Sequence, residues 1–110
     1  MVSKVVITRK AQKQLSEFVG YIAKTFHDKQ AAASVTKDAR QTKERLLDVA
    51  ESLQLCRAPD LAELGYRIIH FTSHRYLFIF EIRGDVAYIE ATYHELQDYE
   101  NTFKTEAHRN

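Results

Sequence analysis

The side chains best suited to chemistry lie in the second half of the chain, where a histidine, arginines and carboxylates alternate with apolar residues. Cleavage of RNA by its own 2′-hydroxyl needs a base for the hydroxyl proton, an acid for the departing 5′ oxygen and a cation beside the phosphate. His94 suits either proton transfer because histidine titrates near neutral pH. The planar fork of Arg75 matches two phosphate oxygens. The candidate site contains His94, Arg75 and Glu81, with Arg67 and Glu90 as substrate contacts.

These side chains also have structural interpretations. At the end of a strand, His94 could simply bond a backbone carbonyl, and Arg75 at a turn could simply pair with Glu81. Metal chemistry is not indicated, because His70 and His74 straddle a strand and a turn instead of sharing one helical face. The sequence has no Gly-rich phosphate loop and no Gly-x-Ser-x-Gly elbow. We therefore expect neither a metal nor a cofactor.

The alternation of side chains along strands predicts which of these groups share a surface. In the last predicted strand, Glu90 and His94 have the same parity, on the more polar face. In the middle strand, Arg75 and Glu81 lie opposite a face that is wholly apolar or aromatic. We expect the helices to cover the apolar faces, so that these four side chains meet on an open face. Arg67 joins them if the register of its strand agrees.

A leading strand and two helices are predicted in the first half of the chain. The β-branched run around Val5 predicts the strand, and Thr8 and Asp28 are suitable N-caps for the helices that follow. Apolar residues then recur at steps of three and four, which is typical of one buried helical face. An antiparallel helical hairpin is therefore expected over about residues 9–54.

Strand signals dominate the second half. Pro59 stands in a predicted loop over residues 57–64, and helical periodicity ends at Gly65. Gly84-Asp85 is a good two-residue hairpin turn. After His94, apolar residues at three- and four-residue steps permit a short helix or a docked extension. The predicted strands are 66–71, 76–82 and 86–93, and the expected docking residues are Leu96, Tyr99 and Phe103.

The resulting fold class is α+β, in the order β-α-α-β-β-β. A helical hairpin packs on one face of a mainly antiparallel four-stranded sheet, and a short C-terminal helix or extension follows. The leading strand adds to the edge of the three-stranded meander once the helices have crossed over.

Composition and charge narrow the functional classes. The 110 residues are expected to form one domain, and the longest apolar runs are far shorter than the roughly 20 residues that cross a bilayer. With no apolar signal segment and a single cysteine, Cys56, a cytoplasmic location is expected.

Residues 1–50 carry ten Lys or Arg against five Asp or Glu, whereas residues 51–110 carry six against ten. This asymmetry predicts a basic helical face, which is either simply solvated or tracks phosphates or an acidic protein partner.

Four consecutive motifs resemble the RelE/ParE toxin superfamily, and the resemblance covers essentially the whole chain. Its strongest marks are Arg75-Tyr76 at the start of the middle strand and Tyr93-His94 at the end of the last. The resemblance implies a toxin encoded beside an antitoxin, whose C-terminal segment wraps the helices and sheet in a toxin–antitoxin hetero-oligomer. The motifs are residues 65–71, 74–80, 86–93 and 94–101.

One branch of the superfamily comprises ribosome-dependent mRNA endonucleases such as RelE and YoeB. Arg75 matches an arginine of these enzymes, Tyr93-His94 resembles the terminal pair of YoeB-like members, and Asp60 after Pro59 takes the place of a catalytic glutamate. This resemblance implies catalytic roles for Arg75, Tyr93, His94 and Asp60, and Glu81 joins them from the predicted open face. An mRNA endoribonuclease that inhibits translation is the first functional prediction.

The other branch comprises ParE-like poisons of DNA gyrase, which have no nuclease activity. The long helical hairpin and the spacing from His94 to Asp98 resemble this branch. Ile69 stands where RelE-like nucleases carry a lysine, Glu95 replaces the terminal tyrosine of YoeB, and the C-terminal segment is acidic. A ParE-like gyrase poison is therefore the alternative prediction, and the target is either mRNA on the ribosome or gyrase.

Overall fold

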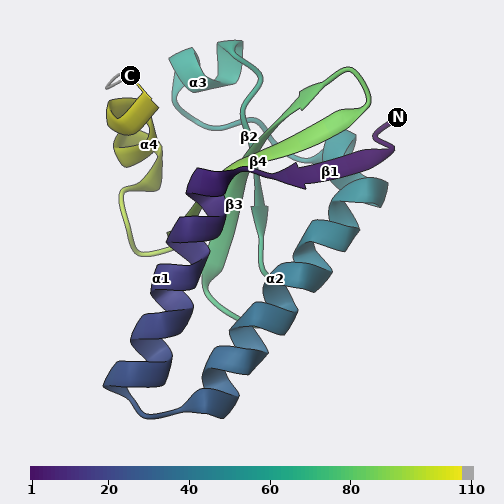
Figure 1. Cartoon of the computed structure of the whole chain (residues 1–110). Coiled ribbons are helices and arrows are strands. Elements are labelled where there is room, and N and C mark those ends of the chain that lie inside the picture. The colour runs from purple at the N-terminus through teal and green to yellow at the C-terminus, as the bar shows by residue number, and fades with distance from the viewer. Residues whose placement is uncertain (108–110) are drawn as a thin grey trace.

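The computed structural model describes residues 1–107, which form a four-stranded mixed sheet with helices on both sides (Figure 1). The order of the elements confirms the predicted α+β fold and resolves the C-terminal segment as a helix. In chain order the elements are β1 Lys4–Ile7, α1 Arg9–Thr25, α2 Lys29–Val49, the 3₁₀ turn η1 Ala50–Ser52, α3 Pro59–Glu63, β2 Arg67–His70, β3 Tyr76–Arg83, β4 Val86–His94 and α4 Tyr99–Ala107.

Local hydrogen bonds begin both helices of the hairpin. Thr8 Oγ1 accepts the N–H of Ala11 at 3.2 Å, and Asp28 Oδ1 accepts that of Ala31 at 2.9 Å, so both predicted caps are confirmed. Between the helices, His27 adopts φ 51°, a left-handed conformation that helps the chain reverse within three residues. Figure 1 shows α1 and α2 diverging from this tip towards the sheet.

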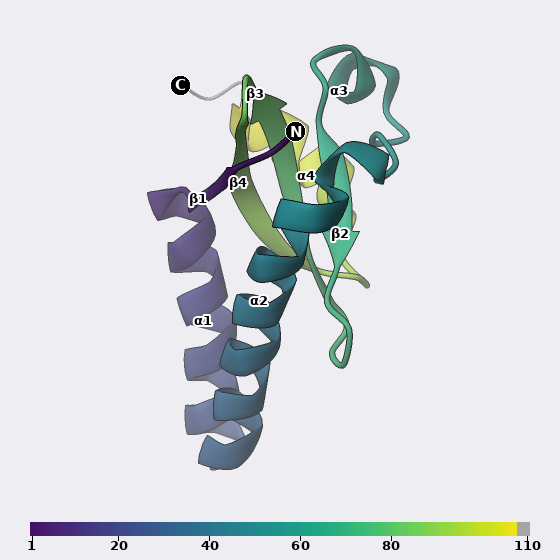
Figure 2. The ribbon, with the colours of Figure 1, turned by 90° about the vertical axis from the view of Figure 1, so that its right-hand side faces the viewer.

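The sheet has the order β1-β4-β3-β2. β2, β3 and β4 form the predicted antiparallel meander, with Gly84 at φ 62° in the turn between β3 and β4. The leading strand β1 lies beside β4 and runs parallel to it, because α1 and α2 carry the chain across the sheet before β2 begins (Figure 2). The sheet is therefore mixed, and its antiparallel pairs dominate.

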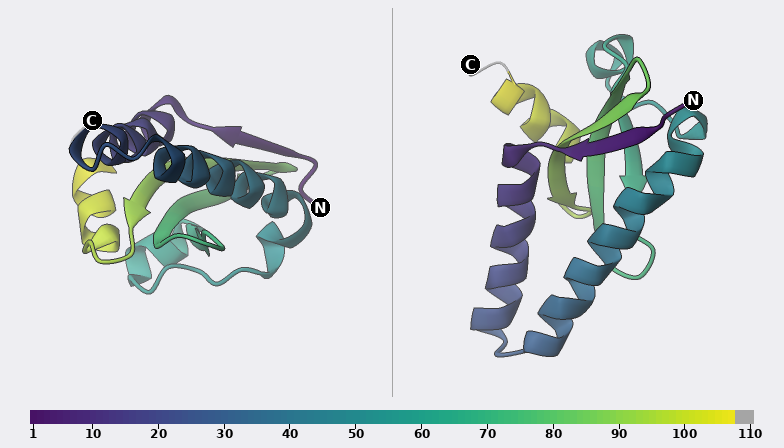
Figure 3. Two further views of the ribbon diagram at one scale, coloured as in Figure 1. Left: turned by 90° about the horizontal axis from the view of Figure 1, so that it is seen from below. Right: turned by 45° about the vertical axis from the view of Figure 1, so that its right-hand side comes forward.

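Helices lie on both sides of the sheet (Figure 3), and each face carries its own apolar core, which corrects the expectation of one open face. On the hairpin side, Phe78, Phe80 and Ile89 pack among the stripes of α1 and α2. On the opposite side, Leu77 and Ile79 pack with apolar residues of α3 and α4. The second group includes Cys56, Leu61, Ala91, Tyr93 and Phe103, all nearly inaccessible to solvent.

An irregularity in the β3–β4 ladder explains why the parity argument failed. Ile79 pairs with Ala91, but the next residue, Phe80, pairs with Ile89, so Glu90 is an extra residue in β4. Such a bulge exchanges the two faces of a strand from that point on. Glu90 keeps the face that we predicted, whereas His94 moves to the hairpin side.

The segment around Pro59 and the residues after His94 also differ from the prediction. The expected loop contains the short helix α3, in which Pro59 takes a first-turn position, where its missing N–H costs nothing. In α4, Tyr99 and Phe103 dock on the second core as predicted. Leu96 does not dock, since it is 75% exposed. Among the helices within residues 1–107, none is both long and apolar enough to cross a membrane.

Candidate functional site

Arg75 lies at the start of β3, beside Glu95 and the end of β4. The guanidinium Nε is 3.7 Å from Glu95 Oε1, while Glu95 Oε2 is 3.0 Å from Nδ1 of His70. The backbone N–H of Glu95 also donates to the carbonyl of Arg75 at 2.9 Å. Arg75 remains 70% exposed and shares the parity of Leu77, so it belongs to the α4 side of the sheet. One carboxylate thus joins Arg75 and His70 on that side.

His94 pairs with Tyr76 across the β3–β4 ladder, and the two rings meet edge to face at a centroid distance of 5.1 Å. The N–H of Leu96 donates to His94 Nδ1 at 3.1 Å, and Gln97 Oε1 accepts the N–H of His94 at 2.8 Å. Because Nδ1 accepts a hydrogen bond, the neutral ring carries its proton on Nε2. The neutral His94 ring therefore presents an Nε2–H donor on its other side.

The His94 ring borders a groove of about 760 Å³ between α1 and the end of β4, which we call the α1 groove. Its wall is largely aromatic and aliphatic, although Tyr21 and Phe26 are 59% and 65% exposed. Leu96 stands at the same groove and is exposed as well. An apolar surface of this kind, on the same molecule as two well-buried cores, is typical of a binding site. The groove residues that carry the apolar character are Phe18, Tyr21, Ile22, Phe26, Tyr76 and Leu96.

Glu81 and Glu90 lie together, but towards the opposite end of β3 from Arg75. Arg83 contacts both carboxylates, at 3.4 Å to Glu81 and 3.9 Å to Glu90, and stacks 4.1 Å over the ring of Tyr88. Burial raises the pKa of Glu90 to about 7, and the neighbouring Glu81 carboxylate adds to this shift. The pKa of Tyr66 also rises, to about 12, through burial and the charges of Glu81 and Glu90. This pair can share a proton near neutral pH, but it does not meet His94 or Arg75.

The remaining predicted site residues have separate partners. Tyr93 donates its hydroxyl to Glu106 Oε1 at 2.7 Å, and burial together with this carboxylate raises its pKa. Asp60 pairs with Lys104 at 3.1 Å, and the bond from this lysine lowers the pKa of the Asp60 carboxyl. Arg67 donates to the carbonyl of Leu53. The expected cluster is thus corrected: apart from the Glu81–Glu90 pair, its members lie in separate places, because the bulge at Glu90 and the packing of α4 were not foreseen. Their catalytic roles stay predictions.

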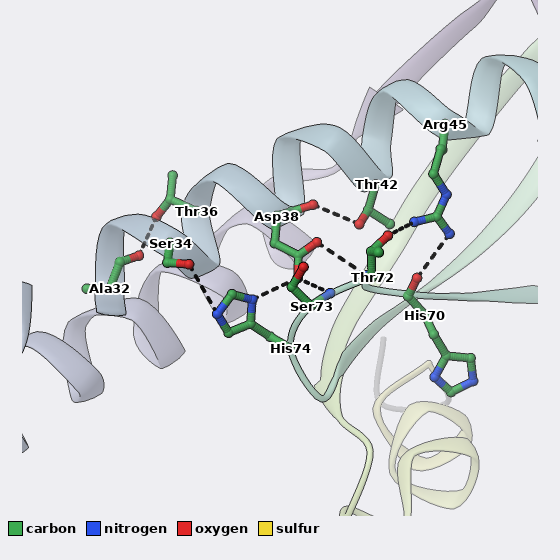
Figure 4. Close-up of polar contacts among 10 residues, drawn as sticks. All are labelled: Ala32, Ser34, Thr36, Asp38, Thr42, Arg45, His70, Thr72, Ser73 and His74. Carbon is green, nitrogen blue, oxygen red and sulfur yellow. Dashed lines mark hydrogen bonds and ion pairs between the residues drawn. The ribbon is translucent and has the colours of Figure 1, made fainter. Parts of the chain in front are cut away.

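A cluster that the sequence did not predict lies where α2 meets the turn between β2 and β3 (Figure 4). Asp38 on α2 is only 3% exposed, and its carboxylate accepts the backbone N–H groups of Thr72 and Ser73 at 3.2 and 2.9 Å. His74 Nδ1 lies 2.7 Å from Asp38 Oδ2, and its Nε2 is 3.3 Å from Ser34 Oγ. Burial by itself would raise the pKa of Asp38, but the bonds from His74, Ser73 and Thr72 lower it below the ordinary value.

Arg45, two turns further along α2, holds the same turn. Its guanidinium donates to the hydroxyl of Thr72 and, at 3.2 Å, to the carbonyl of His70 (Figure 4). Asp38 lies one residue before the apolar position Ala39 of α2. A carboxylate at the edge of a buried helical stripe was the sequence feature from which a buried polar contact could have been predicted. Ser34, His74 and Asp38 contact one another in the order of a hydrolytic Ser-His-Asp triad. The backbone amides beside them already donate to Asp38, so they are not free to stabilise an oxyanion.

Comparison with known proteins decides the family. A family model described as the ParE toxin of the type II toxin–antitoxin system parDE matches residues 5–99. The chain belongs to the ParE toxin family. The match runs from β1 into the start of α4 and includes the hairpin, the sheet except Lys4, and His94. The comparison with curated proteins finds no match.

A solved structure supports the same fold. A chain described as "Chromosomal ParDE TA system from P. aeruginosa" is similar to this ParE-family chain with a TM-score of 0.69 and 19% sequence identity. The similarity covers 86% of this chain and 96% of that chain. The protein is therefore a toxin of the type II toxin–antitoxin class, which confirms the RelE/ParE resemblance.

Proposed function

We propose that this toxin acts by binding DNA gyrase, without hydrolytic chemistry, and that a cognate antitoxin holds it inactive. The ParE family match over residues 5–99 is the observation that carries the proposal. The geometry supports it, since the groups expected to cleave RNA do not form one site. Arg75 and His94 belong to opposite faces of the sheet, and Glu81 and Glu90 lie towards the other end of β3.

The α1 groove is the site that we assign to the antitoxin. Tyr21 and Phe26 present large aromatic surfaces beside the exposed Leu96, and such anchors dominate the energetics of protein interfaces. An amphipathic helix laid in the groove would bury these side chains. The antitoxin would then cover the edge of His94 that the groove exposes.

The direct test compares two purified targets. With gyrase and relaxed plasmid, we expect the toxin to arrest supercoiling and to trap protein-linked DNA breaks, and prior mixing with the antitoxin should abolish both effects. With programmed ribosomes, the same toxin should produce no new mRNA ends. New RNA ends together with unaffected supercoiling would overturn the proposal.

The mRNA endonuclease is the second candidate, because the groove exposes His94 and Arg75 is mostly free of protein contacts. It requires that His94→Ala and Arg75→Ala each abolish ribosome-dependent cleavage while the melting temperature stays nearly unchanged. If cleavage and melting temperature fell together, the two residues would have structural roles only.

A further inference from the structure

The helical hairpin is the most basic part of the described chain. Residues 9–49 contain nine Lys or Arg and five Asp or Glu. Two of these five acids have partners within the chain, because Asp28 caps α2 and Asp38 is buried against the β2–β3 turn. Two of the nine cations are engaged as well, because Arg45 bonds the β2–β3 turn and Lys10 pairs with Glu106. The other charged side chains of the hairpin keep an excess of positive charge.

Part of this charge surrounds a cleft between the two helices. The cleft has a volume of about 220 Å³, and Leu15, Ala39 and Phe78 contribute its apolar lining. Arg40 and Lys43 of α2 line it opposite Gln12 of α1. Ile7 of β1 and Phe78 of β3 also line the cleft, so it lies beside the sheet.

Two further cations, Arg9 and Lys13, lie outside the cleft lining but within one helical turn of Gln12 on α1, and Lys13 also borders a separate shallow groove with Lys24. Arg9 and Lys13 are four residues apart and hence neighbours on the helix surface. Both are solvent-exposed, as is Arg40, and Lys43 is half-buried. Of the ion pairs within residues 1–107, none uses any of these four side chains. We call Arg9, Lys13, Arg40 and Lys43 the basic rim.

We propose that the basic rim binds the sugar-phosphate backbone of duplex DNA, independently of base sequence. Phosphate contacts in protein–DNA complexes come from Arg and Lys together with uncharged amides and hydroxyls. Gln12 lines the cleft and has a second amide N–H beyond the one that it donates to Ser16 at 3.3 Å. Thr36 lines the cleft too, but its hydroxyl already donates to the carbonyl of Ala32 at 3.1 Å. Two carboxylates lie within one turn, Glu17 and Glu44, and they leave the rim with a net positive charge.

The surface chemistry favours a nucleic acid over a protein segment. A protein partner needs buried aromatic or aliphatic anchors, and Tyr21, Phe26 and Leu96 supply them in the α1 groove. Of the large exposed hydrophobic side chains in residues 1–107, Leu47 is the one that lies within a helical turn of the rim. The molecule therefore separates an apolar surface, suited to a protein, from a charged surface, suited to phosphates. This inference concerns DNA itself and does not depend on gyrase being the target.

The test measures binding of the full chain to a fluorescent 20-base-pair duplex of arbitrary sequence at several NaCl concentrations. Each phosphate contact adds roughly 0.9 to the slope of log affinity against log salt. The double variant Arg40→Ala/Lys43→Ala should therefore lose about two units of slope and bind on the order of tenfold more weakly at low salt. The matched control is Lys24→Ala/Lys29→Ala, which removes the same charge from the hairpin tip and should stay within about twofold of the parent.

A second variant, Arg9→Ala/Lys13→Ala, makes the test independent of how α2 tolerates substitution, and it should show the same loss. Circular dichroism confirms that each variant is folded. Three outcomes would overturn the proposal: no binding of the duplex by the parent at low salt, equal losses in the rim and tip variants, or equally tight binding of polyglutamate, which would assign the rim to an acidic protein. Since gyrase is absent from this assay, its result is independent of the supercoiling test.

Discussion

The two ends of β3 hold carboxylates in opposite electrostatic states. Beside its start, Asp38 is only 3% exposed, yet its pKa is below the ordinary value. Towards its other end, the side chain of Glu90 is 22% exposed, and its pKa is raised to about 7. The carboxylate with the lower solvent exposure is thus the one that ionises more easily.

The difference lies in the donors that each carboxylate meets. Asp38 receives two backbone N–H groups and the imidazole of His74, which together outweigh the cost of burial. Burial raises the pKa of Glu90 most, the like charge of Glu81 adds to this shift, and the two carboxylates share the single, mostly exposed Arg83. The buried Asp38 carboxylate therefore holds the start of β3 in place. Near the other end, the carboxylates of Glu81 and Glu90 repel each other when both are ionised.

The largest expected effect is that of removing Asp38. Asp38→Ala leaves the amides of Thr72 and Ser73 and the His74 ring without their partner, and losing a buried ionic partner costs about 3 kcal/mol or more. Urea unfolding at pH 7 measures the change. Asp48→Ala, an exposed carboxylate of the same helix, is the matched control and should cost less than about 0.5 kcal/mol. Equal losses in both variants would show that Asp38 does not hold the turn.

Glu90→Gln should have the next largest effect, and it should stabilise the fold at pH 8. The folded carboxyl keeps its proton up to about pH 7, whereas the unfolded one releases it near 4.5. Folded protein hence binds more protons in this window, and stability is lost as the pH rises from about 4.5 to 7. The variant lacks this loss, so its melting temperature should exceed the parent's by several degrees at pH 8 and match it at pH 4.5. Glu44→Gln, an exposed glutamate, should show no such pH dependence, and a parallel shift in both variants would contradict the assignment.

Arg83→Gln should have the smallest effect. The guanidinium lowers the pKa of Glu90, so its loss should raise this pKa further, with a stability change below about 1 kcal/mol because Arg83 is 61% exposed. An NMR titration of the Glu90 carboxyl carbon measures the shift. Arg57→Gln, an exposed arginine of another loop, serves as the control. An unchanged titration midpoint in Arg83→Gln would mean that Arg83 does not affect the protonation of Glu90, which burial and Glu81 would then set.

The elements of the fold were predictable because their signals are local. Thr8 and Asp28 cap helices through their own side chains, and Gly84 supplies the left-handed residue of a turn. The prediction of a loop around Pro59 was wrong, since a helix of five residues is too short to show helical periodicity in its apolar residues. The resemblance to RelE/ParE toxins was confirmed, while the preference for the nuclease branch is the less well supported of the two predictions.

The sequence by itself determined the α+β order, the hairpin caps, the charge asymmetry and the toxin superfamily, because each of these depends on neighbouring residues or on a motif read along the chain. Only the tertiary structure decided which side chains meet. One extra residue at Glu90 moved His94 to the face opposite Arg75, and the turn at Thr72 brought Asp38 and His74 together across 36 residues of chain. Strand register and long-range pairing arise from packing between elements, so the hydrophobic periodicity of a single strand does not determine them.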